Sequence, residues 1–298
     1  METALTEITL VLFTTIAPAG VVGYLIMAAS IMRSRDDARA NAIGRYLVVP
    51  LVLAITGLIA SATHLGTPAN ALYVITGIGR SPLSNEVVAA VVFLALGGIY
   101  WILSFRDDLR RSFRIAWLSA TVAAGLAFVG YIAAAYSVPS VPTWNLPTAP
   151  LTLWLNALSS GPFVGLFGLL LARQEPSKSV AVALAALAAL AAAGNGVVLV
   201  TQWQELPGIV TTTTRAVDLV PAMPLVIGAY VAFEAVAVAL GGAGALLRGI
   251  GASDDPFAAA QRTRAVRLAL TATSAVLALA ACFAVRFTFY ALHMTLGI

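Results

Sequence analysis

Charged side chains are scarce in this sequence. Asp, Glu, Lys and Arg make up only 10% of its 298 residues, whereas hydrophobic residues make up 60%. A soluble domain carries about 25% charged and about 45–50% apolar residues. No soluble core could bury so much apolar surface, so we expect lipid to surround the chain. The net charge of +4 comes without any long basic run or nucleic-acid motif, and we expect no nucleic-acid partner.

Cysteine and histidine are scarcer still. The chain has one cysteine, Cys282, and two histidines, His64 and His293. One cysteine can form no internal disulfide and cannot supply the four thiolates of an iron–sulfur cluster. Two histidines are too few for a di-haem cytochrome with four histidine ligands. Their number would still allow one haem bound by both of them. We expect neither haem, iron–sulfur cluster nor metal site in this chain.

What the sequence does contain is long apolar runs. A helix needs about 20 apolar residues to cross a bilayer, and β-barrel strands would alternate apolar and polar residues over about 10 positions, which these runs do not. We therefore predict an all-α polytopic membrane protein, a bundle of eight transmembrane helices forming a single integral-membrane domain over residues 1–298. The predicted helices are roughly 6–32, 43–64, 84–105, 113–136, 149–172, 179–202, 222–247 and 266–289.

The basic residues alternate sharply between successive loops. Of the 17 Lys and Arg residues, 14 lie in the odd-numbered loops, and only Arg80, Arg215 and Arg286 remain for the other side. The positive-inside rule then places the odd loops in the cytoplasm and both termini outside. The 14 residues are Arg33, Arg35, Arg39, Arg45, Arg106, Arg110, Arg111, Arg114, Arg173, Lys178, Arg248, Arg262, Arg264 and Arg267.

Ionisable residues within a membrane span are costly and are functional candidates by default. Glu234 lies in the middle of the predicted helix 222–247, Glu86 opens the helix 84–105, and Arg286 lies near the outer end of the last helix. His64 ends the second helix on the same side as Glu86. We interpret Glu234 as a protonated, structural glutamate, with a proton or substrate site of a secondary transporter as the alternative.

His64 and Glu86 form the most informative pair. The segment between them contains glycines and prolines that allow it to fold back, and Ser84 is predicted to cap the helix that Glu86 opens. A quinol hydroxyl needs a hydrogen-bond partner and a proton acceptor as its electrons leave, and a neutral histidine beside a partly buried carboxylate provides both. The pair thus suggests quinol oxidation at the membrane edge, although transporters also use such pairs.

The motifs around this pair are familiar. "HLGTP" at 64–68, followed by "SPLSNE" at 81–86, resembles the "HLG-x-P … S-x-LS-x-E" pattern of the membrane anchor subunit of bacterial dimethyl sulfoxide reductase. The ending "RFTFYALHMTLGI" is similar to that family's C-terminus. This sequence departs from the commoner "SWLSRE" in having Pro82 and Asn85 where Trp and Arg usually stand. A polysulfide-reductase-type quinol anchor, also eight-helical and haem-free, is the alternative within the same class.

The resemblance implies a function in anaerobic respiration at the bacterial cytoplasmic (inner) membrane. The chain would anchor a molybdopterin catalytic subunit and an iron–sulfur electron-transfer subunit on the outer face. It would oxidise bound menaquinol and pass the electrons to the iron–sulfur subunit, with no terminal reductase activity of its own. The family's quinol-site histidine and glutamate map onto His64 and Glu86. The expected quinol-binding residues are His64, Glu86, Gly66, Pro68, Ser84 and Arg286.

Overall fold

The computed structural model describes residues 2–64, 74, 76–211, 214–248 and 255–295. Within these ranges eight helical spans are long and apolar enough to cross a membrane, which confirms the predicted fold class. The second span consists of two helices, α3 and α4. The helices are α1 (Glu2–Thr6), α2 (Ile8–Arg33), α3 (Asp37–Arg45), α4 (Val48–Thr63), α5 (Pro82–Leu103), α6 (Arg111–Ala135), α7 (Thr148–Leu171), α8 (Lys178–Glu205), α9 (Ala216–Leu219), α10 (Met223–Leu246) and α11 (Pro256–Ala291).

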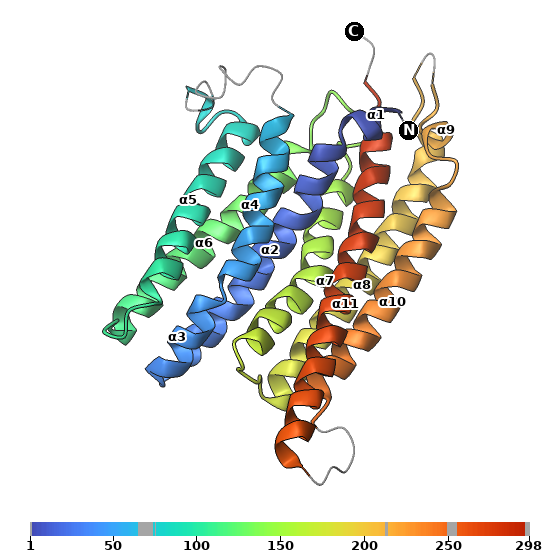
Figure 1. The fold of residues 1–298 in the computed structure, drawn as a ribbon. Helices are drawn as coiled ribbons and strands as arrows, with labels where there is room; N and C mark the ends of the chain where they lie inside the picture. Colours follow the sequence, from blue (N-terminus) through green and yellow to red (C-terminus); the bar gives the residue numbers. More distant parts are fainter. Residues whose placement is uncertain (1, 65–73, 75, 212–213, 249–254, 296–298) are drawn as a thin grey trace.

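The bundle is organised around α2 and α7, which pack against each other and are the most enclosed of the eight spans. Figure 1 shows α4, α5 and α6 on one side of this central pair and α8, α10 and α11 on the other. The outer helices turn large apolar side chains such as Ile102 and Leu190 outward. In a bilayer such side chains face acyl chains and need no protein cover.

Small residues allow the central helices to approach closely. A Cβ built on Gly20 of α2 would lie 2.7 Å from the Pro50 carbonyl oxygen of α4. A Cβ built on Gly161 of α7 would lie 2.5 Å from Val22 of α2. Close backbone approach at small residues is the usual way in which membrane helices associate, because lipid provides no hydrophobic force between them.

The two ends of the bundle differ in composition. We call one the terminal end, because α1 and the end of α11 lie there (Figure 1), and the other the arginine-rich end. At the arginine-rich end, the buried guanidinium of Arg114 lies 2.7 Å from Asp37, and buried Arg267 pairs with Glu175. These two arginines, counted above as topology signals, therefore also tie α6 to α3 and α11 to the loop between α7 and α8.

Candidate functional site

A cavity of about 510 Å³ opens at the terminal end, between α2, α4, α5 and α6. Its volume lies within the range of pockets that bind small molecules, about 300–1,000 Å³. Most of its wall is apolar, and the polar side chains among the described lining residues are those of Ser61, His64, Tyr136 and Trp144. The lining residues are Leu10, Leu58, Ser61, Ala62, His64, Val74, Leu83, Val87, Ala135, Tyr136 and Trp144.

His64 is the C-cap of α4 and has a carboxylate beside it. Its Nε2 atom lies 3.0 Å from Oε2 of Glu7, the residue that precedes α2. The imidazole is 41% exposed, whereas the Glu7 side chain is 25% exposed. The contact is electrostatic rather than an aligned hydrogen bond, since Oε2 of Glu7 has no hydrogen-bond partner among the described residues. When the ring proton is on Nε2, facing the carboxylate, Nδ1 is left as an acceptor for another group.

Glu86 lies in the second turn of α5, between the lining residues Leu83 and Val87. It is 1% exposed, and its Oε2 has no hydrogen-bond partner within the described part of the chain. Glu86 is not itself in the cavity wall, so the structure places it behind the wall that His64 shares. Tyr136 relates Glu86 to the cavity, because it lines the cavity and interacts electrostatically with Glu86. Burial raises the pKa of the Tyr136 phenol, and the neighbouring Tyr290 and Glu86 raise that pKa further.

The predicted start of α5, at residue 84, was wrong by two residues. α5 begins at Pro82, and its N-cap is Ser81, whose hydroxyl accepts a hydrogen bond from the Ser84 amide. Pro82 fits the first turn because its missing N–H would have no partner there. Ser84 is buried, and a Cβ on Gly77 would collide with its Oγ, so its hydroxyl packs against the preceding loop. Glu86 is therefore not a first-turn residue and cannot act as an N-terminal capping carboxylate.

Arg286 lies in a cluster of aromatic rings rather than in the cavity wall. Its guanidinium is fully buried, donates a hydrogen bond from Nε to Thr14 Oγ1 at 3.0 Å, and lies 4.1 Å from the centroid of Phe289. Tyr136 lies 5.8 Å away, measured from the ring centroid to the guanidinium carbon. Arg286 thus adjoins the cavity through Tyr136, whose ring lies near the guanidinium and also forms part of the cavity wall.

Trp144 fixes the loop before α7 onto the end of α11. Its ring stacks on Phe289 with centroids 4.9 Å apart, and its Nε1 donates to the Phe289 carbonyl oxygen at 2.9 Å. The same ring approaches His293, with centroids also 4.9 Å apart. The second histidine is therefore an aromatic-cluster residue in this structure, at the same end of the bundle as His64.

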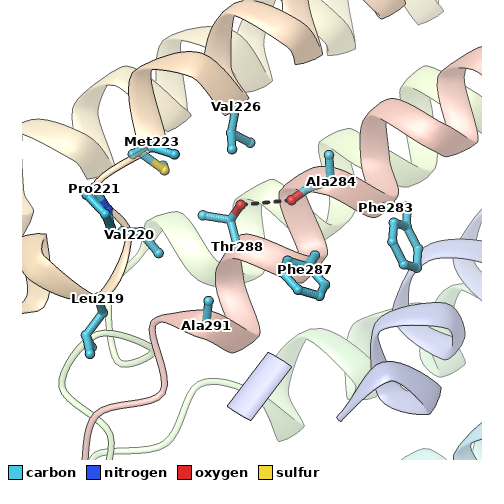
Figure 2. A pocket seen from close by; sticks show the side chains of 11 residues that line it. Leu219, Val220, Pro221, Met223, Val226, Phe283, Ala284, Phe287, Thr288 and Ala291 are labelled. Carbon is cyan, nitrogen blue, oxygen red and sulfur yellow. Dashed lines mark hydrogen bonds between the residues drawn. The ribbon is translucent and has the colours of Figure 1, made fainter. Parts of the chain in front are cut away.

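A second groove at the terminal end serves as a contrast. It has a volume of about 430 Å³ and lies between the start of α10 and the end of α11. Figure 2 shows its apolar lining, in which Thr288 donates its hydroxyl hydrogen to the Ala284 carbonyl oxygen of its own helix. That bond leaves no free side-chain donor among the described lining residues. This groove can hold an acyl chain, but it cannot orient a polar head as the His64 cavity can.

The structure brings together some of the predicted site residues and adds others. His64 lines the cavity, Glu86 and Ser84 lie behind its α5 wall, and Arg286 adjoins Tyr136; Gly66 and Pro68 lie outside the described residues. Sequence reasoning missed Glu7 and Tyr136. Glu7 had one usable signal, since it is an acidic residue just before an apolar helix on the predicted outer side.

Comparison with known proteins agrees with the resemblance. Residues 1–292 match the model of the family described as DMSO reductase anchor subunit (DmsC). The chain belongs to the DMSO reductase anchor subunit family. Among curated members, it is 32% identical to the C subunit of the anaerobic dimethyl sulfoxide reductase of Escherichia coli K12, over 97% of this sequence and 95% of that one.

Two further members of the DMSO reductase anchor subunit family are similarly close. The anaerobic dimethyl sulfoxide reductase subunit YnfH of Escherichia coli K12 is 30% identical, over 97% of this sequence and 95% of its own. The C subunit of the Haemophilus influenzae enzyme is 30% identical, over 74% of this sequence and 78% of its own. The protein is therefore a multi-pass membrane subunit that anchors a complex of DMSO reductase type, with catalytic and electron-transfer subunits as partners.

Proposed function

We propose that this anchor subunit binds menaquinol in the His64 cavity, oxidises it and passes its two electrons to an iron–sulfur cluster of the partner subunit. The observation that carries the proposal is that His64, one of two histidines in the chain, lines an apolar cavity and has Glu7 against its Nε2. An apolar cavity with few, fixed polar groups suits a head group that must be oriented while its isoprenoid tail stays in lipid.

The proton chemistry follows from the arrangement. With Nε2 facing the Glu7 carboxylate, Nδ1 of His64 accepts a hydrogen bond from one quinol hydroxyl. Glu86 receives a proton by way of Tyr136, which lines the cavity and interacts electrostatically with the buried carboxylate. Oxidation of one quinol releases two protons and two electrons, so the electrons go to the partner's cluster and the protons leave at the terminal end. His64 and Glu86 act as catalytic residues, and Arg286 positions Tyr136.

The site's location also defines where the partners dock. Electron transfer requires the cluster to approach the His64 cavity, so the iron–sulfur subunit, and with it the molybdopterin subunit, would cover the terminal end. We propose that this end faces the outside of the bacterial inner membrane, because most of the basic residues lie at the opposite end.

Replacing His64 tests the proposal most directly. His64→Arg puts a permanent positive charge where a neutral acceptor is needed, and Glu86→Gln keeps the side-chain shape and removes the base. We expect each variant to lose nearly all menaquinol oxidation by the assembled complex, measured spectrophotometrically with a soluble menaquinol analogue. The same complexes should remain active with an artificial donor that reduces the soluble subunits directly.

The matched control is His293→Gln, which changes the other histidine at the same end but outside the cavity wall. It should retain most menaquinol oxidation. If the His64 and Glu86 variants oxidise menaquinol at the wild-type rate, the cavity is not the quinol site. If all three variants lose activity alike, the terminal end is sensitive to any change and His64 has no special role.

A further inference from the structure

A second polar site lies at mid-membrane, enclosed by α7, α8, α10 and α11. Ser159 Oγ donates a hydrogen bond to Oε1 of Glu234 at 2.8 Å, and Cys282 Sγ lies 3.7 Å from the same oxygen. Asn195 Nδ2 donates to Asn156 Oδ1 at 2.8 Å one turn away on the same face of α7. These five side chains are buried, and Glu234 is 2% exposed at the middle of α10.

The second oxygen of Glu234 is unsatisfied. A charged carboxylate at the centre of a bilayer is costly, so we expect Glu234 to be neutral. Because Oε1 accepts from Ser159, the acidic hydrogen belongs on Oε2. Oε2 has no hydrogen-bond partner among the described residues. Leaving a buried donor without a partner costs free energy, so an acceptor supplied from outside the chain would recover that free energy on binding.

Glu234 lies in the wall of a groove that could admit such an acceptor. The groove, between α8 and α10, has a volume of about 740 Å³. Its walls are otherwise Ala, Gly, Val and Ile, apart from Thr201, whose hydroxyl donates to the Val197 carbonyl oxygen. Along α8 the lining runs from Ala189 to Thr201, a length of about 18 Å. Glu234 is therefore the one described lining residue with a spare hydrogen-bonding atom. Because that oxygen is enclosed in this structure, the carboxyl group must turn toward the groove to present it to an occupant.

The depth of Glu234 limits what the occupant can be. A phospholipid keeps its ester and phosphate groups at the interface, far from the middle of α10. The occupant must bring an uncharged acceptor to mid-membrane and extend a long apolar chain along α8. A quinone carbonyl on an isoprenoid tail meets both conditions. We propose that the groove between α8 and α10 binds one isoprenoid quinone, whose carbonyl oxygen accepts a hydrogen bond from Glu234.

This site is separate from the His64 cavity and does not depend on the function proposed there. The two share no lining residue. No electron transfer is assigned to the bound quinone, since the groove lies at mid-membrane and Glu234 is its one free polar group among the residues described.

Photolabelling of the full chain in nanodiscs of phosphatidylethanolamine and phosphatidylglycerol tests the proposal. The probe is an azido-benzoquinone with a decyl tail, and the labelled peptides are identified by mass spectrometry. We expect label on α8 or α10 next to Glu234, separately from any label near the His64 cavity. An excess of the non-photoreactive decyl-benzoquinone should displace it, and an equal excess of dioleoylglycerol should not.

Two matched variants locate the bound probe. A Cβ on Gly196 would meet only Val231 Cγ2, at 3.7 Å, so α8 tolerates a side chain there, and Gly196→Leu would fill the groove. A Cβ on Gly228, on the exposed side of α10, would meet no atom within 4 Å, which makes Gly228→Leu the control. We expect Gly196→Leu to reduce labelling beside Glu234 at least tenfold and Gly228→Leu to leave it within twofold.

A third variant tests the hydrogen bond itself. Glu234→Met keeps the length of the side chain and removes the donor, and we expect it to reduce the same labelling at least fivefold while the protein elutes as a single peak. Absence of label from α8 and α10 in the wild type, or labelling that persists in Gly196→Leu, would overturn the proposal. So would displacement of the probe by dioleoylglycerol, which would make the groove a general acyl-chain site. In each case the labelling near His64 reports separately on the other cavity.

Discussion

At the scale of single residues, the His64 cavity depends on contacts that no local sequence pattern encodes. His64 and Glu86 could be singled out because they are rare polar groups beside long apolar runs. Glu7 could be noted as an acidic residue before an apolar helix, but its contact with His64 could not be predicted, because it joins the start of α2 to the end of α4 and periodicity within one helix says nothing about its neighbour. The same reason explains why Tyr136 was missed, since it reaches the cavity from the end of α6.

Glu7→Gln tests whether this carboxylate positions His64. Glutamine keeps the size but loses the charge, so the electrostatic contact with His64 Nε2 weakens by about 1 kcal/mol. Since each ~1.36 kcal/mol is tenfold in rate, we expect menaquinol oxidation to fall about fivefold, with the artificial-donor activity unchanged. Glu205→Gln, an exposed glutamate at the same end, is the control and should change the rate less than twofold. A wild-type rate in Glu7→Gln would show that His64 needs no carboxylate beside it.

Arg286→Lys tests the aromatic cluster next to the cavity. The planar guanidinium lies over Phe289 while its Nε bonds Thr14, and a lysine ammonium cannot do both. We expect the variant to lose about 1–2 kcal/mol of stability and to melt several degrees lower in detergent, as measured by scanning fluorimetry. Arg215→Lys, exposed at the same end, should melt at the wild-type temperature. Equal melting of the two variants would show that the stacking of Arg286 contributes nothing.

At the scale of helices, apolar runs predict the spans well and their ends poorly. Lipid requires every span to be a long apolar helix, so the eight runs were found from composition alone. The ends are set by caps that composition does not show. α3 begins at Asp37, where the Asp36 side chain accepts from the Ala38 amide, and α11 begins at Pro256, well before the predicted position. Both extensions carry polar residues at the arginine-rich end, Asp37 and Arg39 in α3 and Gln261, Arg262 and Arg264 in α11, so a search for long apolar runs leaves them out.

The crossing of α2 and α4 depends on a position that only glycine can occupy. In Gly20→Ala, the new Cβ would lie 2.7 Å from the Pro50 carbonyl oxygen and 2.8 Å from the Ala54 nitrogen, and neither backbone atom can move without separating the helices. We expect a loss of about 1–3 kcal/mol and a lower melting temperature in detergent. Gly98→Ala is the matched control in α5, because nothing lies within 4 Å of its Cβ. It should be neutral or slightly stabilising, since alanine favours helix by about 0.5–1 kcal/mol. Equal effects would mean that α2 and α4 are not closely packed.

At the scale of the whole molecule, the two ends carry different kinds of charge. The arginine-rich end holds most of the basic residues, including buried Arg114 and Arg267, which pair with the exposed carboxylates of Asp37 and Glu175. The terminal end holds the His64 cavity, Glu7 and the aromatic cluster around Arg286. The sequence predicts this division because loop charge sets orientation during insertion. It does not predict the interior of either end, which depends on which helices become neighbours.

Orientation in the membrane is testable with single cysteines. In a Cys282→Ala background, Ala38→Cys places a thiol at the arginine-rich end and Ile78→Cys places one at the terminal end, both at exposed positions. Because basic loops stay in the cytoplasm, we expect a membrane-impermeant maleimide to label Ile78→Cys in intact cells and to label Ala38→Cys only after permeabilisation. The result decides more than topology. If Ala38→Cys were labelled in intact cells and Ile78→Cys were not, the His64 cavity would open to the cytoplasm, and both the proton release and the docking of the partner subunits would have to be assigned to that side.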